Sequence, residues 1–309
     1  MLPFARVAIV GMGLIGSSLA RAIRDAMPTV AITASDADPQ VRARVSELGI
    51  ADDVADTAGA AVVDADLVIL CVPVGAMAAV AEQIAPDLAP HTVVSDVGSV
   101  KESVARVLAE TLPGVHVIPA HPVAGTEKSG PDAGFASLFQ GRWCIITPPP
   151  RADATMVERL AIFWRRLGAK VDVMDAAHHD RVLAVTSHLP HLIAYSIVGT
   201  ASDLEEVTKS EVIKYSAGGF RDFTRIAASD PVMWRDVFLN NREAVLELLG
   251  RFTEDLVALQ RAIRWGDGET LEALFTRTRA IRRSIISEGQ DTDQPDFGRA
   301  HPDLPPGNR

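Results

Sequence analysis

The sequence predicts an α/β protein in which an N-terminal doubly wound domain is followed by an all-helical domain. A chain of 309 residues has room for two domains of about 150 residues each. Up to residue 175, short β-branched runs alternate with alanine-rich helical stretches, the pattern of βαβ units. Beyond Asp175 only long helical patterns follow. We therefore expect domains at residues 1–175 and 176–288, and a poorly ordered polar tail at 289–309.

The expected strands are nearly continuous apolar runs, as is typical of strands that helices cover on both faces of a parallel sheet. They are Val7–Val10, Val30–Ala34, Leu67–Val72, Thr92–Ser95, Val115–Ile118, Cys144–Thr147 and Lys170–Val173. The helices expected between them include Leu14–Ala26, Val74–Ile84, Val100–Glu110 and Thr155–Leu167. Right-handed crossovers between such strands make the sheet doubly wound.

The second half predicts long helices, and short signals mark some of their ends. The expected helices are Ala176–Thr200, Glu205–Lys214, Asp222–Ala228, Val232–Trp265 and Gly268–Ile286. Asp175 is a candidate N-cap, and Asp230 is another, with Pro231 at the first helical position. Pro190 lies inside the first helix and cannot donate to the carbonyl of Thr186, so we expect a kink or local opening there.

Composition narrows the class of protein. The hydrophobic share of 48% and the charged share of 23% are ordinary for a globular protein. A net charge of −10 without a basic cluster disfavours nucleic acid as a partner. Cys71 and Cys144 lie far apart in apolar runs, which predicts buried thiols. We see no leader peptide and no uncharged apolar run near the roughly 18 residues of a membrane span, so we expect a cytoplasmic protein.

A glycine motif follows the first expected strand and opens the first expected helix. Its residues are Gly11, Met12, Gly13, Leu14, Ile15 and Gly16. Glycines at these positions permit a tight turn, close approach to a pyrophosphate and close helix–strand packing, while the helix N-terminus attracts phosphate. Asp36, at the end of the second strand, suits the ribose 2′-hydroxyl of NAD and repels the 2′-phosphate of NADP. The motif predicts a Rossmann domain that binds NAD; the alternative is an ordinary turn with a surface aspartate.

Polar or conformationally special residues recur where the expected strands end. Gly11, Asp36, Val72 and Pro73, Asp96–Ser99 and Ala120–Pro122 all fall at such ends. Ligands of open parallel sheets bind at this edge, so Val72 and Pro73 are further cofactor candidates. A histidine there, His121, can accept a proton near neutral pH. The plainer alternative is a surface histidine in a loop.

Four segments together carry a more specific signal. They are SDVGSVK (Ser95–Lys101), HPVAGTEKSG (His121–Gly130), SHLPH (Ser187–His191) and GGFRDFTRIAASDPVMW (Gly218–Trp234). In kind and order they resemble the prephenate/arogenate (cyclohexadienyl) dehydrogenase family of tyrosine biosynthesis, over roughly residues 5 to 287. The resemblance implies NAD-dependent oxidative decarboxylation of prephenate to 4-hydroxyphenylpyruvate, and many family members also convert L-arogenate to tyrosine.

The resemblance also implies roles for individual residues. His121 resembles the catalytic histidine that takes the proton of the ring hydroxyl, and Ser99 resembles the serine that holds this hydroxyl. Arg225 resembles the arginine that binds a substrate carboxylate, a task for which two parallel hydrogen bonds suit it.

Five further positions match the family's substrate pocket. Ser187 and His191 resemble pocket residues and, four apart, share one helical face. Glu127 and Asp222 resemble an ion-pair or gate position near the entrance, and Asp222 and Arg225 are expected on one face at the start of a helix. Trp234 resembles a tryptophan that closes the pocket and can come from the partner subunit. We expect a homodimer formed through the helical domain.

Each of these residues has a structural alternative. Ser99 could cap the helix expected at Val100, His191 and Trp234 could be core or interface residues, and Arg225 could pair only with Asp222. His178, His179, His188 and His191 lack the carboxylates or thiolates that would complete a metal site, so we expect none.

Other functions stay open at this point. They are an arogenate-specific dehydrogenase, a β-hydroxyacid dehydrogenase and an NAD(H)-sensing regulator without turnover. The β-hydroxyacid family relies on a lysine in its helical half, and here Lys209 and Lys214, the lysines after Lys170, lie in no matching motif.

Overall fold

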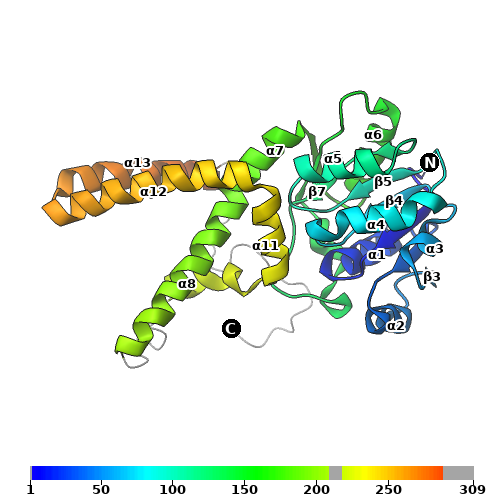
Figure 1. Cartoon of the computed structure of the whole chain (residues 1–309), viewed down its shortest axis with the longest axis horizontal. Coiled ribbons are helices and arrows are strands. Elements are labelled where there is room, and N and C mark those ends of the chain that lie inside the picture. Colours follow the sequence, from blue (N-terminus) through cyan, green and yellow to red (C-terminus); the bar gives the residue numbers. More distant parts are fainter. Residues whose placement is uncertain (1, 209–217, 288–309) are drawn as a thin grey trace. The chain divides into compact units, whose positions relative to one another are not determined.

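The computed structural model describes residues 2–208 and 218–287 (Figure 1). Its internal contacts divide the chain into two compact units, Met1–Lys214 with Thr224–Leu246, and Tyr215–Phe223 with Glu247–Arg309. The predicted tail at 289–309 and residues 209–214 of one predicted helix lie outside the described residues.

Six parallel strands form the main sheet of the first unit. They are β1 (Arg6–Val10), β2 (Ala31–Ser35), β3 (Asp53–Val54), β4 (Leu67–Leu70), β5 (Val93–Asp96) and β6 (His116–Val117). Their order, β3-β2-β1-β4-β5-β6, is that of a doubly wound Rossmann sheet, which confirms the predicted fold class. The two-residue β3 was not predicted, because Asp53 and Val54 make no apolar run.

Three further strands form a second sheet, so the seven predicted strands do not share one sheet. They are β7 (Ala120–Pro122), β8 (Trp143–Ile146) and β9 (Lys170–Val173). Strand β7 pairs antiparallel with β8, and β8 pairs parallel with β9. Because β7 follows β6 after only Ile118 and Pro119, the chain has no room for the crossover that a parallel neighbour needs. The chain therefore leaves the first sheet at this point.

The helices of the N-terminal half connect the strands along the chain. They are α1 (Leu14–Ala26), α2 (Pro39–Leu48), α3 (Ala58–Val62), α4 (Met77–Ile84), α5 (Glu102–Thr111) and α6 (Ala154–Arg166). Helix α1 has the predicted bounds. Helix α5 begins two residues later than predicted, which decides the role of Ser99 below.

The first long helical stretch of the C-terminal half is locally opened. It consists of α7 (Ala176–Leu183), a π-helical segment (Ala184–His188) and α8 (Leu189–Thr208). The π-helical segment ends just before Pro190, which confirms the predicted opening. Asp175 caps α7 through a 3.1 Å hydrogen bond that it accepts from the His178 amide, also as predicted.

This stretch also meets the length and composition of a membrane span. Residues Ala176–Asp203 are long and apolar enough to cross a bilayer, although the sequence patterns predicted no such segment. Three of its polar side chains, His179, Asp180 and His188, are buried within the protein. These three side chains contribute to the polar site described below.

The remaining helices are α10 (Gly218–Thr224), a 3₁₀ helix η6 (Arg225–Ala228), α11 (Pro231–Asn240), α12 (Arg242–Trp265) and α13 (Gly268–Ser287). The predicted helix Val232–Trp265 is thus interrupted at Asn241. Asp230 accepts a 2.8 Å hydrogen bond from the Met233 amide, and Pro231 is the first residue of α11, as predicted.

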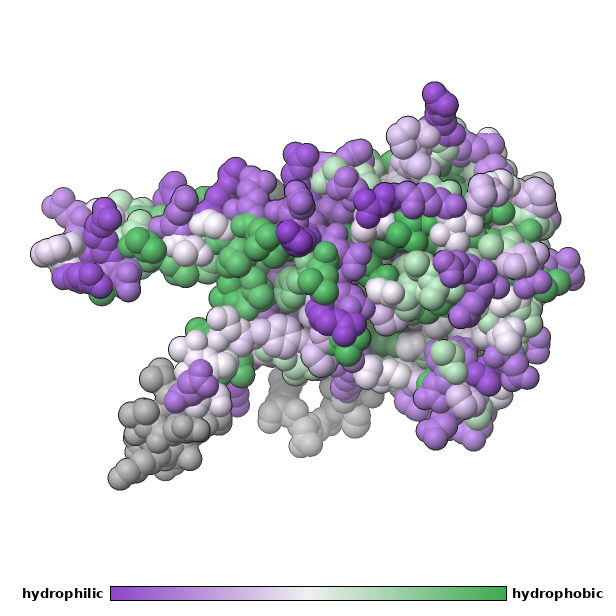
Figure 2. Space-filling model, in the orientation of Figure 1, coloured by the Kyte–Doolittle hydropathy of each residue, from purple (hydrophilic) through white to green (hydrophobic). Residues whose placement is uncertain are grey.

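Helices α12 and α13 leave large apolar side chains exposed. Figure 2 shows apolar side chains among polar ones along these helices. The exposed apolar residues of the two helices include Leu256, Val257, Ile263, Trp265, Phe275 and Ile281. An exposed apolar surface of this kind is typical of a protein interface.

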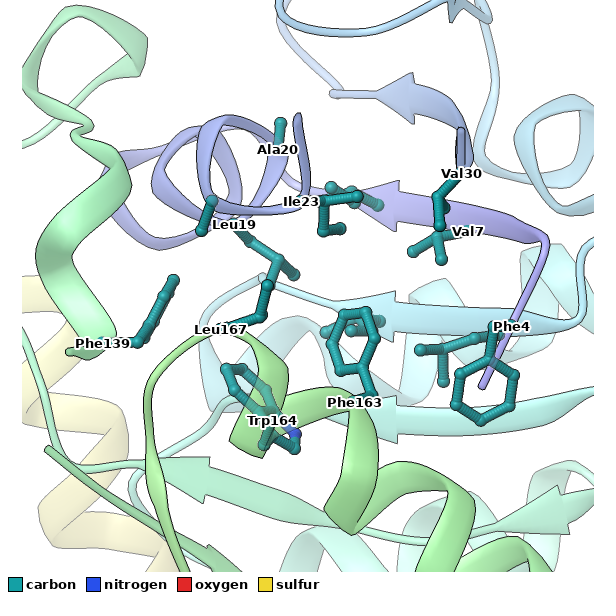
Figure 3. Close-up of a cluster of buried hydrophobic side chains, with 14 of the residues drawn as sticks. Phe4, Val7, Leu19, Ala20, Ile23, Val30, Phe139, Phe163, Trp164 and Leu167 are labelled. Atoms are coloured by element: carbon teal, nitrogen blue, oxygen red, sulfur yellow. The ribbon is translucent and has the colours of Figure 1, made fainter. Parts of the chain in front are cut away.

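The main core lies on one face of the Rossmann sheet and holds helix α1, which begins within the glycine motif, against that sheet. Figure 3 shows Leu19 and Ile23 of α1 above Phe163 and Trp164 of α6. Trp164 is fully buried, and its ring lies 5.7 Å from that of Phe163. Burying each such side chain stabilises the fold by about 1.5–3 kcal/mol. Helix α1 is therefore held firmly against the sheet.

Candidate active site

The turn after β1 has the geometry that its glycines predict. Gly11 has a φ of +96°, and a Cβ atom there would lie 2.5 Å from the carbonyl oxygen of Cys71 and 2.9 Å from Cγ1 of Val72. A Cβ at Gly16 would lie 2.0 Å from the carbonyl oxygen of Gly11. Gly13 has no atom within 4 Å of its Cβ position, so a ligand can approach the backbone there.

The start of α1 suits an anion. No side chain caps this helix at Gly13, and no acidic residue lies in its first turn, which begins with Leu14 and Ile15. Asp36 lies against the turn, because its Oδ2 accepts a 2.7 Å hydrogen bond from the Met12 amide. Amide hydrogens for phosphates beside a carboxylate for a ribose hydroxyl fit a bound dinucleotide.

The loop after β4 lies beside this turn. Strand register places Val10 opposite Leu70 and Leu70 opposite Asp96, so the chain segments that follow β1, β4 and β5 leave the sheet side by side. Val72 and Pro73 therefore lie at the predicted edge, next to the glycine turn.

A buried ion pair that the sequence did not predict lies at the end of β5. Lys101 and Asp96 are both fully buried, and the Lys101 ammonium contacts the Asp96 carboxylate and donates to the Ala120 carbonyl at 3.0 Å. Burial lowers the pKa of Lys101 and raises that of Asp96, and each charge opposes the shift of the other. This pair joins β5 to the strand that carries His121.

Asp180 caps α5 from outside that helix. Its two carboxylate oxygens accept hydrogen bonds from the amides of Lys101 (2.7 Å) and Glu102 (2.9 Å). The N-cap residue is Lys101, which makes no side-chain cap. The alternative that Ser99 caps this helix is therefore wrong.

His121 lies on β7 opposite Ile145, within a strand and not in the loop that the sequence suggested. It is buried, and its Nδ1 lies 2.9 Å from Nε2 of His179. The other ring nitrogen of His179 lies 2.8 Å from Oδ1 of Asp180. Burial lowers the pKa of His121 well below its usual value, and the charges of His179 and Lys101 lower it further. A neutral imidazole can accept a proton at pH 7.

His188, the last residue of the π-helical segment, is buried and close enough to His121 for its charge to lower the pKa of His121. Burial lowers the pKa of His188 to about 4, while the backbone of Ser99 opposes the shift. Its Nδ1 accepts a 3.0 Å hydrogen bond from the Asn241 amide, which also donates to the Asp180 carbonyl at 2.8 Å. Ser99, half-buried in the loop between β5 and α5, is thus close to His188 and to the network around His121.

His191 and Trp234 form an aromatic wall. Their rings stack with centroids 3.6 Å apart, and Nδ1 of His191 donates to the Ser187 carbonyl at 2.8 Å. Burial lowers the pKa of His191, and the charge of Arg225 adds to this effect. Ser187 and His191 therefore lie together on one helical face, as predicted, and Arg225 is near them.

Arg225 pairs with Glu127, one of the two residues that the resemblance assigns to an ion-pair or gate position. Its Nη1 lies 2.9 Å from Oε2 of Glu127, in a half-exposed pair. Asp222 and Arg225 do not begin one helix, because α10 ends at Thr224 and Arg225 starts η6. The alternative that Arg225 pairs only with Asp222 is therefore wrong.

The structure brings most predicted site residues into one connected region. Contacts and charge effects link His121 to His188, His188 to His191 and His191 to Arg225. Residues that sequence reasoning missed are Asp96, Lys101, His179, Asp180 and Asn241. His179 and His188 were weighed only as metal ligands. Within residues 2–208 and 218–287, no cluster of His, Cys, Asp and Glu side chains is arranged to hold a metal ion.

Two family models match consecutive parts of the chain. The model of the prephenate dehydrogenase nucleotide-binding domain matches residues 19–173, and that of the prephenate dehydrogenase dimerization domain matches residues 175–277. The chain is 45% identical to the cyclohexadienyl dehydrogenase of Zymomonas mobilis over 288 residues, covering 93% of the chain and 98% of that protein. It is 33% identical to the prephenate dehydrogenase of Bacillus subtilis over 281 residues, covering 90% and 76%.

Solved structures agree with the sequence comparison. The prephenate dehydrogenase of Aquifex aeolicus, crystallised with hydroxyphenyl propionate and NAD+, has a TM-score of 0.83 and 33% identity, covering 93% of this chain and 98% of that one. The arogenate dehydrogenase of Synechocystis has a TM-score of 0.76 and 25% identity, covering 91% and 99%. The chain therefore belongs to the prephenate dehydrogenase family of NAD-dependent oxidoreductases.

Proposed function

We propose that this enzyme converts prephenate to 4-hydroxyphenylpyruvate with NAD, and that it also converts L-arogenate to tyrosine. The observation that carries the proposal is the buried His121, whose lowered pKa keeps it neutral beside the strand ends that form the dinucleotide cradle. The cyclohexadienyl dehydrogenase of Zymomonas mobilis, 45% identical, supports the dual substrate range. An arogenate-specific enzyme is the alternative.

The proposed mechanism requires only a weak base from the protein. NAD, when bound, supplies the acceptor for the hydride that leaves C4 of the substrate ring. His121 takes the proton of the C4 hydroxyl as the hydride departs, and Ser99 holds that hydroxyl in line. No residue has to drive the loss of the ring carboxylate as CO₂, because formation of the aromatic ring does so.

Arg225 is the proposed ligand of a substrate carboxylate. Its guanidinium is half-exposed and already holds one carboxylate, that of Glu127. A substrate carboxylate can take the place of Glu127, which makes the pair a gate at the entrance. An arginine that gripped the leaving ring carboxylate would oppose decarboxylation, so Arg225 serves binding. Asp222 is assigned to the entrance by its motif position.

Ser187, His191 and Trp234 are the proposed pocket wall. The stacked rings of His191 and Trp234 offer an apolar surface to the substrate ring. Nδ1 of His191 donates to the Ser187 carbonyl, so Nε2 of the neutral ring is an acceptor. The ammonium of L-arogenate can donate to such an acceptor, which favours acceptance of both substrates.

We further propose a cytoplasmic homodimer that forms through the helical domain. The matched dimerization-domain model and the exposed apolar residues of α12 and α13 support this assembly (Figure 2). Light scattering of the purified protein should give twice the mass of the chain. A monomer at micromolar concentration would contradict the proposal.

The test of the reaction is a paired assay. Formation of NADH is followed with prephenate and with L-arogenate, and His121→Asn provides the background. We expect turnover with both substrates and kcat/KM values within about 100-fold of each other. Turnover of arogenate alone would establish the alternative, and turnover of neither would refute the proposal.

A further inference from the structure

We propose that His179 and Asp180 are positioning residues that hold His121 in the tautomer with its hydrogen on Nδ1, leaving Nε2 as the base. The inference rests on the proposed function only for the task that it gives to Nε2. It rests on geometry for the tautomer itself. The contacts join three buried side chains in a row, Asp180, His179 and His121.

The row begins at Asp180, which fixes the direction of every hydrogen bond that follows. Its carboxylate oxygens accept from the amides of Lys101 and Glu102, and Oδ1 also lies 2.8 Å from Nδ1 of His179. A carboxylate that receives two amide hydrogens acts as an acceptor. Nδ1 of His179 must therefore carry the hydrogen of that contact.

The same reasoning passes to the second ring. Burial lowers the pKa of His179, so the ring is neutral at pH 7 and has one hydrogen, on Nδ1. Its Nε2 is then an acceptor, 2.9 Å from Nδ1 of His121. Nδ1 of His121 must be the donor, because the other tautomer would bring two lone pairs together at this distance. Nε2 of the neutral His121 is left without a hydrogen.

The surroundings keep this arrangement in place. The two rings meet edge to face, with centroids 5.1 Å apart, and both are buried, so the contact is shielded from bulk water. The ion pair of Lys101 with Asp96 holds the carbonyl of Ala120, directly before His121. When Nε2 of His121 takes the substrate proton, Nδ1 keeps its hydrogen and continues to donate it to Nε2 of His179, so no hydrogen bond has to break.

Two substitutions at His179 separate positioning from other roles. In His179→Gln the side-chain oxygen can accept from Nδ1 of His121, but it cannot bind a proton. In His179→Leu no acceptor remains. We expect His179→Leu to lower kcat at least 100-fold with KM within about threefold, and His179→Gln to retain kcat within about tenfold of the wild type. The neighbouring exposed His178 supplies the control, and His178→Leu should leave both constants unchanged.

Two outcomes would overturn this assignment. Near-normal turnover of His179→Leu would show that the contact is not needed. A folded His179→Gln as impaired as His179→Leu would make His179 a proton carrier and not a positioning residue. Thermal unfolding and NAD binding establish that each variant is folded.

Asp180→Ala provides a second route if His179→Leu fails to fold. It removes the oxygen that accepts the Nδ1 hydrogen of His179, so neither histidine ring is held in one tautomer. We expect kcat to fall by about 10²–10⁴-fold, as removal of such a carboxylate does in serine proteases, with NAD affinity unchanged. Unchanged turnover would contradict the proposal.

A readout without substrate separates this inference from the proposed function. Nitrogen NMR of the full chain labelled in histidine, assigned with His121→Asn, should show Nδ1 of His121 protonated and Nε2 unprotonated near pH 7.

The pH dependence of the same spectra must be interpreted against the groups that face His121. These are His179, Lys101 with Asp96, and His188. The opposite tautomer in the wild type would refute the inference even if prephenate is turned over. The expected tautomer without any turnover would instead refute only the proposed function.

Discussion

The indole ring of Trp234 lies on the imidazole ring of His191, with ring centroids 3.6 Å apart and planes 22° apart. The two residues come from α11 and α8, so the contact joins two helices that each contribute a residue to the proposed pocket wall. Phe238 extends the aromatic surface, 5.5 Å from Trp234. The indole nitrogen of Trp234 is buried without a hydrogen-bond partner among the described residues.

Shortening Trp234 should therefore affect both stability and substrate binding. Trp234→Ala removes a buried ring and should lower the free energy of unfolding by about 3 kcal/mol and raise KM for prephenate. Trp234→Phe retains a stacked ring and should cost about 1 kcal/mol. Denaturant unfolding and steady-state kinetics measure the two effects. Trp143→Ala, at a half-exposed tryptophan, is the control, and equal losses at both positions would contradict the assignment.

His121→Asn should abolish most turnover without changing the affinity for NAD. The proton acceptor is lost, so kcat should fall by about 10²–10⁴-fold. The glycine turn and Asp36 are unchanged, so the Kd for NAD, measured by fluorescence titration, should stay within about threefold. Near-normal turnover would eliminate His121 as the base.

Arg225→Ala should raise KM for prephenate about 10-fold or more, with kcat within about threefold, because the lost hydrogen bonds are binding contacts. The KM of Arg225→Lys should lie between those of the wild type and Arg225→Ala, since an ammonium cannot form the two parallel hydrogen bonds. Glu127→Gln is the matched variant and should lower KM, because its carboxylate competes for Arg225. A larger effect of Arg225→Ala on kcat than on KM would assign the arginine to chemistry.

Asp36→Ser should relax the preference for NAD. The substitution removes the carboxylate that repels a 2′-phosphate, and the guanidinium of Arg42, whose Nη1 donates to the Asp36 carbonyl at 2.8 Å, lies nearby. We expect KM for NAD to rise about 10-fold and NADP to become a substrate. The double variant with Arg42→Ala should lose the gain with NADP. An unchanged ratio of kcat/KM for NAD to kcat/KM for NADP would show that Asp36 does not contact the ribose.

Acid should destabilise the protein through its buried histidines. The pKa of His188 is about 4 in the folded chain and 6.5 as its ordinary value, so between these values the unfolded chain binds more protons. The contribution of His188 to the free energy of unfolding is fully present above pH 6.5 and is lost as the pH falls toward 4. The loss is at most about 3 kcal/mol, at about 1.4 kcal/mol per pH unit. His188→Asn, which keeps an acceptor for Asn241, should show a flatter decline in denaturant unfolding between pH 7 and about 4. An equal slope in both proteins would contradict this origin.

Several elements could be predicted because their causes lie within a few residues of each other. The bounds of α1, the caps Asp175 and Asp230 and the opening before Pro190 each follow from one or two side chains and the local backbone. The glycine turn is of the same kind, since Gly11 and Gly16 are required by contacts within the turn and with the adjacent strand. The short β3 could not be predicted, because two residues carry no periodicity.

The sequence by itself determined the Rossmann start, the helical second half and, through four motifs, the family. Only the tertiary structure decided that His121 lies on a strand of a second sheet and that Arg225 forms an ion pair with Glu127. It also decided that His179 contacts both His121 and Asp180. The partners in these contacts lie 58 residues apart for His121 and His179, and 98 for Arg225 and Glu127. Hydrophobic periodicity and capping act over a few residues, whereas such distant pairs meet only where the packing of whole helices and strands brings them together.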